Sequence, residues 1–530
     1  MGKGSRNREI RISENQGNSS SEVKLSKKQL IRMQEKKARI KKYLSMAAVL
    51  VIAVSLVVAI VATSLAKTPK LEGVIAATSE KYEIDNAMIA YLLYNQYTSF
   101  INENYYILSY YGLDTAKSLK SQKVTGTDQT WFAYFLSSVQ AQLNELIALA
   151  TEAEEKGYSL DEDEIATIDS EMKELKEYAN KQGYVSLDRY LATVYVNGVT
   201  AKSVRTIREL QALATKYYTD LLKTFEYTDE EIAKFVEDNP SSFYMFDYVY
   251  YTFKAEYAST ATAAEKKEAL AEAKKKAEEF LAKASDPKAF RNLIVEMEKE
   301  IEAAKKETGT GVVTSTPVSG STEKTDEDYL KNFTKTEVLY VEDDDFFEWA
   351  FKDERKAGDT TLIEDAVKYT VTVYLLDAPK YLDEAITKDV RHILFSLEEY
   401  TDADAKAKAE EILAQYKAGE MTAEAFGELA KEYSYDGNAK DGGLYENVLE
   451  GKMVTEFNDW IFHKDRKAGD VDIVKTQFGY HMMYFVGDGK ITWKVNAENG
   501  LKNEEYTDYL EELEKKYPVT YDYEKIANIP

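Results

Sequence analysis

The sequence contains no cysteine, three histidines and seven prolines among its 530 residues. Without cysteine the chain has no disulfide framework, no thiolate zinc site, no cysteine nucleophile and no cysteine to carry a lipid. Three histidines leave little for a metal cluster and no phosphate-binding glycine loop occurs, so the sequence implies neither a metal nor a cofactor. The low proline content and the 44% of hydrophobic residues are typical of a folded, helix-rich chain.

Outside the N-terminal region acidic residues clearly outnumber basic ones. Residues 1–42 contain 13 Lys/Arg and 4 Asp/Glu, whereas residues 43–530 contain 55 Lys/Arg and 89 Asp/Glu. An acidic body repels phosphate backbones, so we expect no binding to nucleic acid. The basic tail is interpreted as a cytoplasmic segment that sets membrane topology beside anionic lipid.

Residues 43–66 contain no charged side chain and are almost wholly aliphatic. A run of this length predicts one transmembrane helix that acts as a signal anchor. The basic residues before it outnumber Lys67 and Lys70 after it, which predicts a cytoplasmic N-terminus and a main body outside the cell membrane. The alternative is a cleaved signal peptide, because Ser64-Leu65-Ala66 places small residues at a plausible cleavage position. The length of the run favours the uncleaved anchor.

Residues 75–240 are predicted to form a helical domain. Apolar residues from Val204 to Leu221 recur at three- and four-residue spacing, and Thr228–Glu231 is a capping box that opens another helix. The domain contains many tyrosines, which either line a groove for apolar peptide or pack the helices against one another; helix packing is the preferred interpretation. The tyrosines singled out are Tyr105, Tyr106, Tyr110, Tyr111, Tyr217 and Tyr218.

An internal repeat follows. Residues 346–359 (FFEWAFKDERKAGD) and 457–470 (FNDWIFHKDRKAGD) are identical at 8 of 14 positions, and a strand-like segment follows each copy. Two related domains are therefore expected, at 241–378 and 387–488. The first contains a Gly/Ser/Thr-rich stretch, 307–327, which is expected to be a mobile loop. A closing helix is expected from Glu504 to Lys516.

The second copy contains two of the three histidines. A strand is expected at 390–395, and its period of two places Val390, His392 and Leu394 on one face. A second strand near the end of the copy places His481 with Met483 and Phe485 on one face and Tyr480 with Met482 and Tyr484 on the other. Helices are expected between these strands, around 403–417, 426–433 and 457–461. His463 lies in a charged stretch and is expected to have no role.

This second copy resembles the parvulin (PpiC-type) peptidyl-prolyl isomerase domain. The resemblance is carried by His392-Ile-Leu, the segment from Gly419 to Ser434, Gly442-Gly443-Leu444, Gly451-Lys-Met453 with Glu456-Phe457, and Lys475-Thr-Gln-Phe-Gly-Tyr-His481. It implies that His392 and His481 form a paired core, that Asp436 faces the substrate bond and that Thr476 bonds to the histidines. It also implies a proline pocket formed by Met453 and Phe457, with Leu444 in its wall.

The first copy contains no histidine and aligns Val249 with His392 and Thr370 with His481. By resemblance it is a degenerate parvulin-like domain with a structural or client-binding role. The whole arrangement is similar to the PrsA and SurA families of extracytoplasmic folding factors, in which the C-terminal helix (here about 500–530) packs back on the N-terminal domain. The expected fold class is therefore α+β multidomain: one transmembrane helix, a helical chaperone-like domain and two parvulin-like domains.

The resulting prediction is a single-pass, extracytoplasmic peptidyl-prolyl cis-trans isomerase and chaperone whose partners are unfolded or folding exported polypeptides. A noncatalytic holdase, in which both parvulin-like domains only bind extended peptide, stays open as an alternative. A surface adhesin or adaptor is a third alternative, although no ligand-binding motif or wall-attachment repeat supports it. The sequence leaves homodimerisation open.

Overall fold

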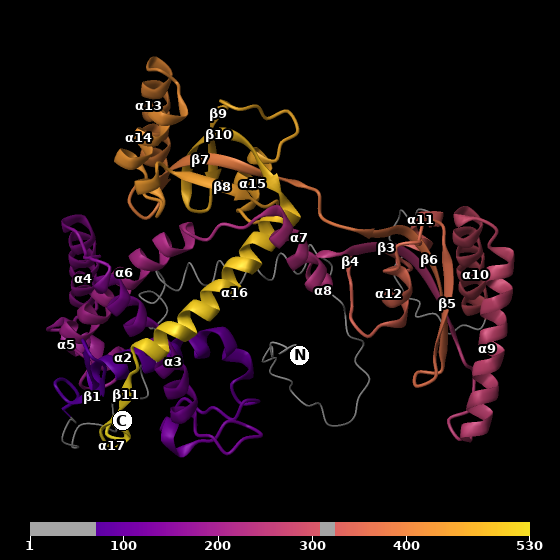
Figure 1. Cartoon of the computed structure of the whole chain (residues 1–530), viewed down its shortest axis with the longest axis horizontal. Helices are drawn as coiled ribbons and strands as arrows, with labels where there is room; N and C mark the ends of the chain where they lie inside the picture. The colour runs from indigo at the N-terminus through magenta and orange to yellow at the C-terminus, as the bar shows by residue number, and fades with distance from the viewer. Residues whose placement is uncertain (1–69, 308–323) are drawn as a thin grey trace. The chain divides into compact units, whose positions relative to one another are not determined.

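The computed structural model describes residues 70–307 and 324–530, which form a multidomain α+β structure (Figure 1). The predicted tail 1–42, the predicted anchor 43–66 and most of the predicted loop 307–327 lie outside these residues. Within the two described ranges, no helix has both the length and the apolar character needed to cross a bilayer. Residues 245–381 form one compact unit, and residues 70–244 together with 382–530 form another.

The helical region is built around the long helix α3, against which both α2 and α6 pack, and α2 and α6 also contact each other. Its core includes Trp131, Leu143 and Ile147 of α3 and Ile207 of α6, all buried. The capping box predicted at Thr228–Glu231 is confirmed, because each side chain bonds the other residue's backbone N–H. The helices are α2 (Asn86–Asn104), α3 (Trp131–Glu155), α4 (Glu162–Lys181), α5 (Leu187–Val194), α6 (Ala201–Lys223), α7 (Asp229–Asp238) and α8 (Pro240–Phe243).

The start of this region differs from the prediction. Residues expected to be helical form strands β1 (Ile75–Thr78) and β2 (Glu83–Asp85), which pair with β11 (Thr520–Tyr521) in the order β11-β1-β2. The partner strand comes from the other end of the chain, and α17 (Tyr523–Ile526) follows it. A local pattern cannot register a partner more than 400 residues away, and this long-range pairing overrides helical propensity.

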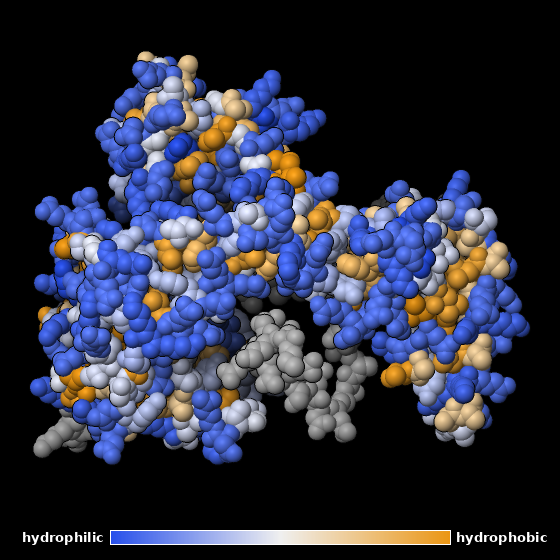
Figure 2. Space-filling view, viewed as in Figure 1, coloured by the Kyte–Doolittle hydropathy of each residue, from blue (hydrophilic) through white to orange (hydrophobic). Residues whose placement is uncertain are grey.

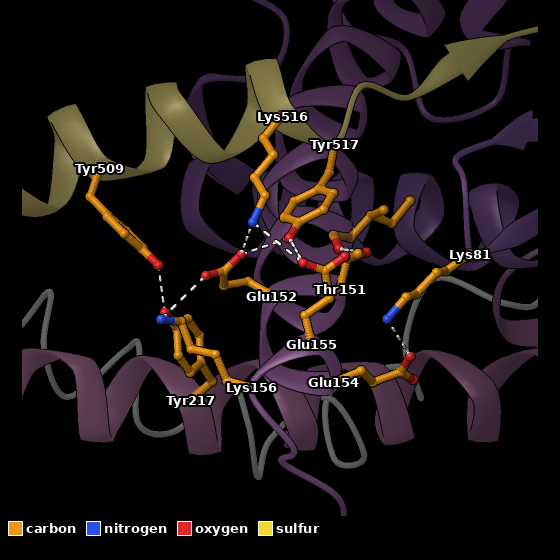
Figure 3. A network of polar contacts seen from close by, with 11 residues as sticks. Lys81, Thr151, Glu152, Glu154, Glu155, Lys156, Tyr217, Tyr509, Lys516 and Tyr517 are labelled. Carbon is orange, nitrogen blue, oxygen red and sulfur yellow. Dashed lines mark hydrogen bonds and ion pairs between the residues drawn. The ribbon is translucent and has the colours of Figure 1, made fainter.

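The C-terminal helix α16 (Thr492–Lys516) packs against α3. Figure 3 shows Lys516 and Tyr517 directed at two carboxylates of α3. Lys516 Nζ lies 2.8 Å from Glu152 Oε2, and the Tyr517 hydroxyl donates to Glu152 at 2.7 Å and to Glu155 at 2.5 Å. Burial acts to raise the pKa of Glu152, but these donors outweigh it and hold that pKa below its usual range. The network therefore stabilises the folded helical region above about pH 4.5 and weakens as Glu152 is protonated below that pH.

Glu514, on the same helix, has the opposite shift. Burial and the neighbouring Glu145 and Glu511 raise its pKa, because its charged form lacks solvation and faces like charges. We expect Glu514→Gln to stabilise the fold slightly at pH 7. The gain in unfolding free energy should be less than about 1 kcal/mol and should appear as a small rise in melting temperature. The gain should vanish below about pH 4.5, where the glutamate is neutral in both states. Thermal unfolding at pH 7 and pH 4 measures both values, and equal gains at the two pH values would contradict the electrostatic cause.

The first α+β region is a four-stranded antiparallel sheet in the order β4-β3-β6-β5. Helices α9 and α10 cover one face, where Val249, Tyr251 and Val373 join their core. The other face packs on α12 through Phe346 and Tyr374, whose stacked rings lie 4.1 Å apart. The elements are β3 (Met245–Lys254), α9 (Ala263–Lys283), α10 (Pro287–Glu307), α11 (Asp326–Leu330), β4 (Thr334–Leu339), α12 (Asp345–Ala350), β5 (Thr360–Asp365) and β6 (Thr370–Tyr381).

The second α+β region repeats this arrangement, with a four-stranded sheet in the order β8-β7-β10-β9. Helices α13 and α14 cover one face, and α15 covers the other with Phe457 and Ile461. The predicted faces are confirmed: Tyr480 and Met482 pack on α13 and α14, whereas Met483 and Phe485 pack on α15. The elements are β7 (Ile386–Ser396), α13 (Asp402–Ala418), α14 (Ala423–Tyr433), η4 (Ala439–Asp441), β8 (Leu444–Val448), α15 (Thr455–Ile461), β9 (Val471–Thr476) and β10 (Gly479–Ile491).

The repeated sequence makes equivalent contacts in both sheets. Arg355 stacks over Trp349 and donates to its carbonyl oxygen, and Arg466 does the same with Trp460. The repeat therefore encodes the same junction between a short helix and the following edge strand in both regions. Figure 2 shows that mostly hydrophilic side chains cover the visible face of the molecule, in keeping with the net charge of −25.

Candidate active site

The two histidines of the second region meet across neighbouring strands. His392 on β7 pairs in register with Met483, and His481 on β10 pairs with Leu394, so the two side chains share the face that packs on α15. Their Nδ1 atoms lie 3.0 Å apart and their rings are nearly parallel at 17°. Both side chains are buried, with 3% and 5% exposure. The predicted histidine pair is present in the structure.

Thr476, at the end of β9, lies beside this pair. Its Oγ1 is 2.8 Å from Nε2 of His481, and it accepts a hydrogen bond from the backbone N–H of Phe478 at 3.1 Å. The tight turn to β10 brings it there, because Thr476 pairs with Gly479. Gly479 has φ +147°, and a Cβ at that position would lie 2.1 Å from the Phe395 carbonyl oxygen. The predicted contact between Thr476 and a histidine is therefore present, and it is made with His481.

Asp436 approaches the pair from the other side. It lies in the turn after α14, and that turn is held on β7 because the Tyr435 N–H donates to Leu394 O and the Leu394 N–H donates to Ser434 Oγ. Asp436 Oδ2 is 3.6 Å from Nε2 of His392, and the carboxylate is 8% exposed. Nε2 itself is buried and makes no hydrogen bond within the described structure.

These contacts constrain the proton positions. A hydrogen bond between two Nδ1 atoms needs one N–H and one lone pair, so at least one imidazole is neutral. With Thr476 donating to Nε2 of His481, Nδ1–H of His481 donates to Nδ1 of His392, and His392 carries its proton on Nε2 beside Asp436. The reverse order would set a bare nitrogen lone pair against a carboxylate, which is electrostatically unfavourable. The site therefore presents a buried N–H donor next to a carboxylate.

Phe457 and Met453 pack next to the pair. The Phe457 ring meets His392 and His481 edge-on at 5.3 and 5.6 Å, which fixes both imidazoles in place. Met453 is half-buried and packs in the same hydrophobic cluster. Their predicted contact with a substrate proline remains a prediction.

The structure assigns Leu444 and Tyr445 differently from the prediction. Leu444 pairs with Arg391 and Tyr445 pairs with Val390, so Tyr445 lies on the His392 face of the sheet and Leu444 on the opposite face. The prediction that Leu444 lines the pocket is therefore not supported by its position. The difference arises from the strand register. Gly443 is the last residue before β8, has φ +68° and lies directly against the His392 carbonyl. Its position therefore sets which side chain of β8 faces the histidines.

Tyr445 was not singled out from the sequence. Its ring lies 5.3 Å from that of His392, and its hydroxyl donates to both Asp436 oxygens, at 3.0 and 3.3 Å. Burial, together with the Asp436 charge, raises its pKa above the usual range, so the phenol stays protonated and remains a donor. The strand-like sequence at 444–448 indicates that alternate side chains face opposite sides of the sheet. Which of them face the histidines is known only once the register between β8 and β7 is known.

We expect Tyr445→Phe to lower the predicted isomerase activity at least about 10-fold, because a hydrogen bond to a charged group contributes about 1.5–3 kcal/mol. The ring remains and no cavity opens, but the buried Asp436 carboxylate loses a donor, so melting temperatures must accompany the rates. The ratio of kcat/KM between variant and parent measures the effect. An unchanged ratio would show that Asp436 does not depend on this donor.

The first region carries different residues at the matching positions. Leu376 exchanges backbone hydrogen bonds with the Gly-Asp pair that ends its repeat copy, and Phe485 does the same in the second copy, so these two residues correspond. Two residues earlier on each strand, Tyr374 pairs with Tyr250 and Met483 pairs with His392. By this register Tyr250 corresponds to His392 and Thr372 to His481, which corrects the predicted Val249 and Thr370. The shift from Thr370 to Thr372 arises because the turn between Asp365 and Thr370 is two residues longer than the turn between Thr476 and Gly479. Within the described residues no group of three His, Asp or Glu side chains is arranged to hold a metal ion.

Residues 380–487 match the PPIC-type PPIase domain family. Similar curated proteins are Foldase protein PrsA of Geobacillus kaustophilus (37% identity over 110 residues, 19% of this chain and 38% of that protein) and Foldase protein PrsA of Bacillus subtilis (38% over 126 residues, 23% and 38%). The chain thus spans less than two-fifths of the length of these relatives. The resemblance of this segment to a parvulin domain of the PrsA type is confirmed.

Similar solved structures include PrsA from Bacillus subtilis, with 17% identity, a TM-score of 0.23, and coverage of 74% of this chain and 89% of that one. The PPIase domain of TbPar42 has 27% identity and a TM-score of 0.17, with coverage of 19% and 98%.

Proposed function

We propose that the chain is an extracytoplasmic peptidyl-prolyl cis-trans isomerase and chaperone that acts on unfolded or folding exported polypeptides. The observation that supports this most directly is the buried His392–His481 pair, flanked by Thr476 and Asp436, inside a segment that matches a PPIase family. The names of the relatives, which are foldases, support the wider role in protein folding.

The reaction needs no bond to break. Rotation about an X-Pro amide meets a barrier of about 18–20 kcal/mol, because the nitrogen lone pair is delocalised into the carbonyl. Unaided isomerisation therefore takes tens of seconds or longer. A catalyst must hold the proline, exclude the water that stabilises the planar amide, and bind the twisted geometry more tightly than the planar one.

The side chains of the site suit this task. Met453 and Phe457 offer apolar surface for the proline ring. The Nε2–H of His392, placed in a buried environment, can donate to the amide as its carbonyl turns out of conjugation, and such preorganised donors act strongly where water is excluded. Asp436 orients that donor and sets the local field, and Thr476 fixes the tautomer of the histidine behind it. No proton needs to be transferred in this mechanism.

The remaining parts of the chain have proposed roles of their own. Residues 1–42 form a cytoplasmic tail, residues 43–66 anchor the chain in the cell membrane as one helix, and residues 75–240 with α16 form a chaperone domain. Residues 241–378 form a degenerate parvulin-like domain without isomerase activity, because Tyr250 and Thr372 replace the histidines. This loss supports the alternative proposal of a noncatalytic holdase, since the same sheet persists without the site.

Refolding of a proline-limited protein separates the two proposals. We expect the chain to accelerate the slow refolding phase and Asp436→Ala to abolish most of that acceleration. Asp465→Ala is the matched control, since its side chain is 75% exposed and lies outside the site. Suppressed aggregation that is equal in all three proteins, without acceleration of the slow phase, would favour the holdase and contradict the isomerase.

A further inference from the structure

Four exposed side chains cluster at the end of α2, in η2 (Tyr105–Ile107) and the turn after it. We call Tyr105, Tyr106, Ile107 and Tyr110 the tyrosine patch; they are 67%, 95%, 46% and 75% exposed. The other exposed large hydrophobic residues of the described structure are spread along the chain, whereas these four lie within six consecutive residues. The interpretation that tyrosines pack helices holds for Tyr217, which is buried, but is wrong for Tyr105, Tyr106 and Tyr110.

The patch is held on an ordered base. Leu108, within this segment, and Leu113, just after it, are buried in the helical core, and the Leu113 N–H donates to the Leu108 carbonyl. The patch tyrosines contact other rings, as in the Tyr105–Tyr106 pair at 5.5 Å, but their hydroxyl groups make no hydrogen bond to the described residues. Buried leucines thus support aromatic rings that project outward.

The shape and chemistry of the patch favour an interface with lipid. A peptide site is concave and covers its lining, whereas a tyrosine that is 95% exposed projects from the surface. Tyrosine is enriched at the level of membrane headgroups, because its ring is apolar and its hydroxyl bonds polar headgroups or water. Residues 105–130 contain three lysines and two aspartates, so this segment lacks the excess negative charge of the body and can approach an anionic leaflet.

The length of chain before the helical region supplies the second argument. The apolar run ends at Ala66 and Leu71 is already fully buried in the helical core. The intervening residues span at most roughly 17 Å when fully extended. A span at 43–66 would therefore hold this region at the membrane surface. In Figure 1 β1 and the 105–130 segment both lie along the lower edge of the helical region.

We propose that the tyrosine patch docks into the headgroup layer of the membrane and sets the orientation of the helical region on it. This inference rests on the proposed membrane anchor. It assigns the patch to lipid, and neither a client polypeptide nor a second copy of the chain is its occupant.

The absence of cysteine allows a direct test with the full chain in vesicles of phosphatidylcholine and phosphatidylglycerol. A polarity-sensitive fluorophore on Ser109→Cys would report from within the patch without removing a tyrosine, and one on Val185→Cys, an 89% exposed position of the same region, is the matched control. We expect nitroxide lipids labelled near the headgroup to quench the Ser109 probe several-fold more than the Val185 probe. Adding Tyr105→Ser, Tyr106→Ser and Tyr110→Ser should reduce quenching at Ser109 to the control level.

Flotation of the vesicles separates the two proposals. If the chain floats with the vesicles but the two probes are quenched equally, or the serine substitutions change nothing, docking by the patch is contradicted while the anchor stands. If the chain does not float, the anchor itself is contradicted, and the docking proposal falls with it. A Ser109 probe that responds to unfolded polypeptide or to protein concentration, and not to lipid, would assign the patch to a client or to self-association and overturn the proposal.

Discussion

Replacing either His392 or His481 with alanine is expected to lower isomerase activity at least about 100-fold, which is the size of effect seen when a preorganised donor is removed from an active site. The double substitution should lose little more than either single one. His392 presents its Nε2–H only if its Nδ1 accepts from His481, so the two imidazoles act as one unit.

The measurement is the rate at which each variant accelerates isomerisation in a proline-containing peptide, at equal concentrations of folded protein. His463→Ala is the control, since its side chain is 57% exposed and outside the site. Both active-site histidines are buried, so melting temperatures must accompany the rates. Additive losses, with the double variant slower by the product of the two single effects, would refute the linked pair.

Tyr517→Ala is expected to destabilise the helical region by about 3–5 kcal/mol, the range for removing a large buried aromatic side chain. Tyr517 is 4% exposed, and its hydroxyl donates to Glu152 and Glu155 of α3. The substitution therefore opens a cavity and also leaves the largely buried Glu152 carboxylate with one donor fewer.

Urea unfolding followed by circular dichroism at 222 nm measures this loss, because α2–α7 together with α16 contain more than half of the helical residues of the described structure. Tyr523→Ala is a control on the same terminal segment, where the side chain is 61% exposed and bonds only at the surface. We expect that control to stay within about 0.5 kcal/mol of the parent. Equal destabilisation by both substitutions would show that the contact with α3 contributes nothing specific.

Local patterns were sufficient for much of the second α+β region. The period of two around His392 and His481 predicted the correct faces, and the resemblance to parvulins brought Thr476 and Asp436 to the same place. What failed was register. A tight Gly442-Gly443 turn decides whether Leu444 or Tyr445 faces the histidines. A two-residue difference between hairpins moves the residue of the first region that corresponds to His481 from Thr370 to Thr372.

Helix boundaries failed where tertiary contact opposes propensity. The closing helix begins at Thr492, 12 residues before the predicted start, although Asn496, Asn499 and Gly500 are poor helix formers. Gly500 is there because Phe235 of α7 packs directly against it; a Cβ would lie 2.4 Å from that ring. The low propensity of this stretch reflects close helix packing, which becomes apparent only once α7 is in place.

The strand β11 has a consequence for biogenesis. The helical region is interrupted in sequence by both α+β regions, and its core is completed by Leu513, Tyr517, Ile526 and Ile529 near the end of the chain. During synthesis from the N-terminus these residues emerge last, whereas each α+β sheet is encoded by one continuous segment. The sheets can therefore fold while the helical region still lacks part of its core. A truncated or stalled chain would then contain folded α+β regions without a complete helical region.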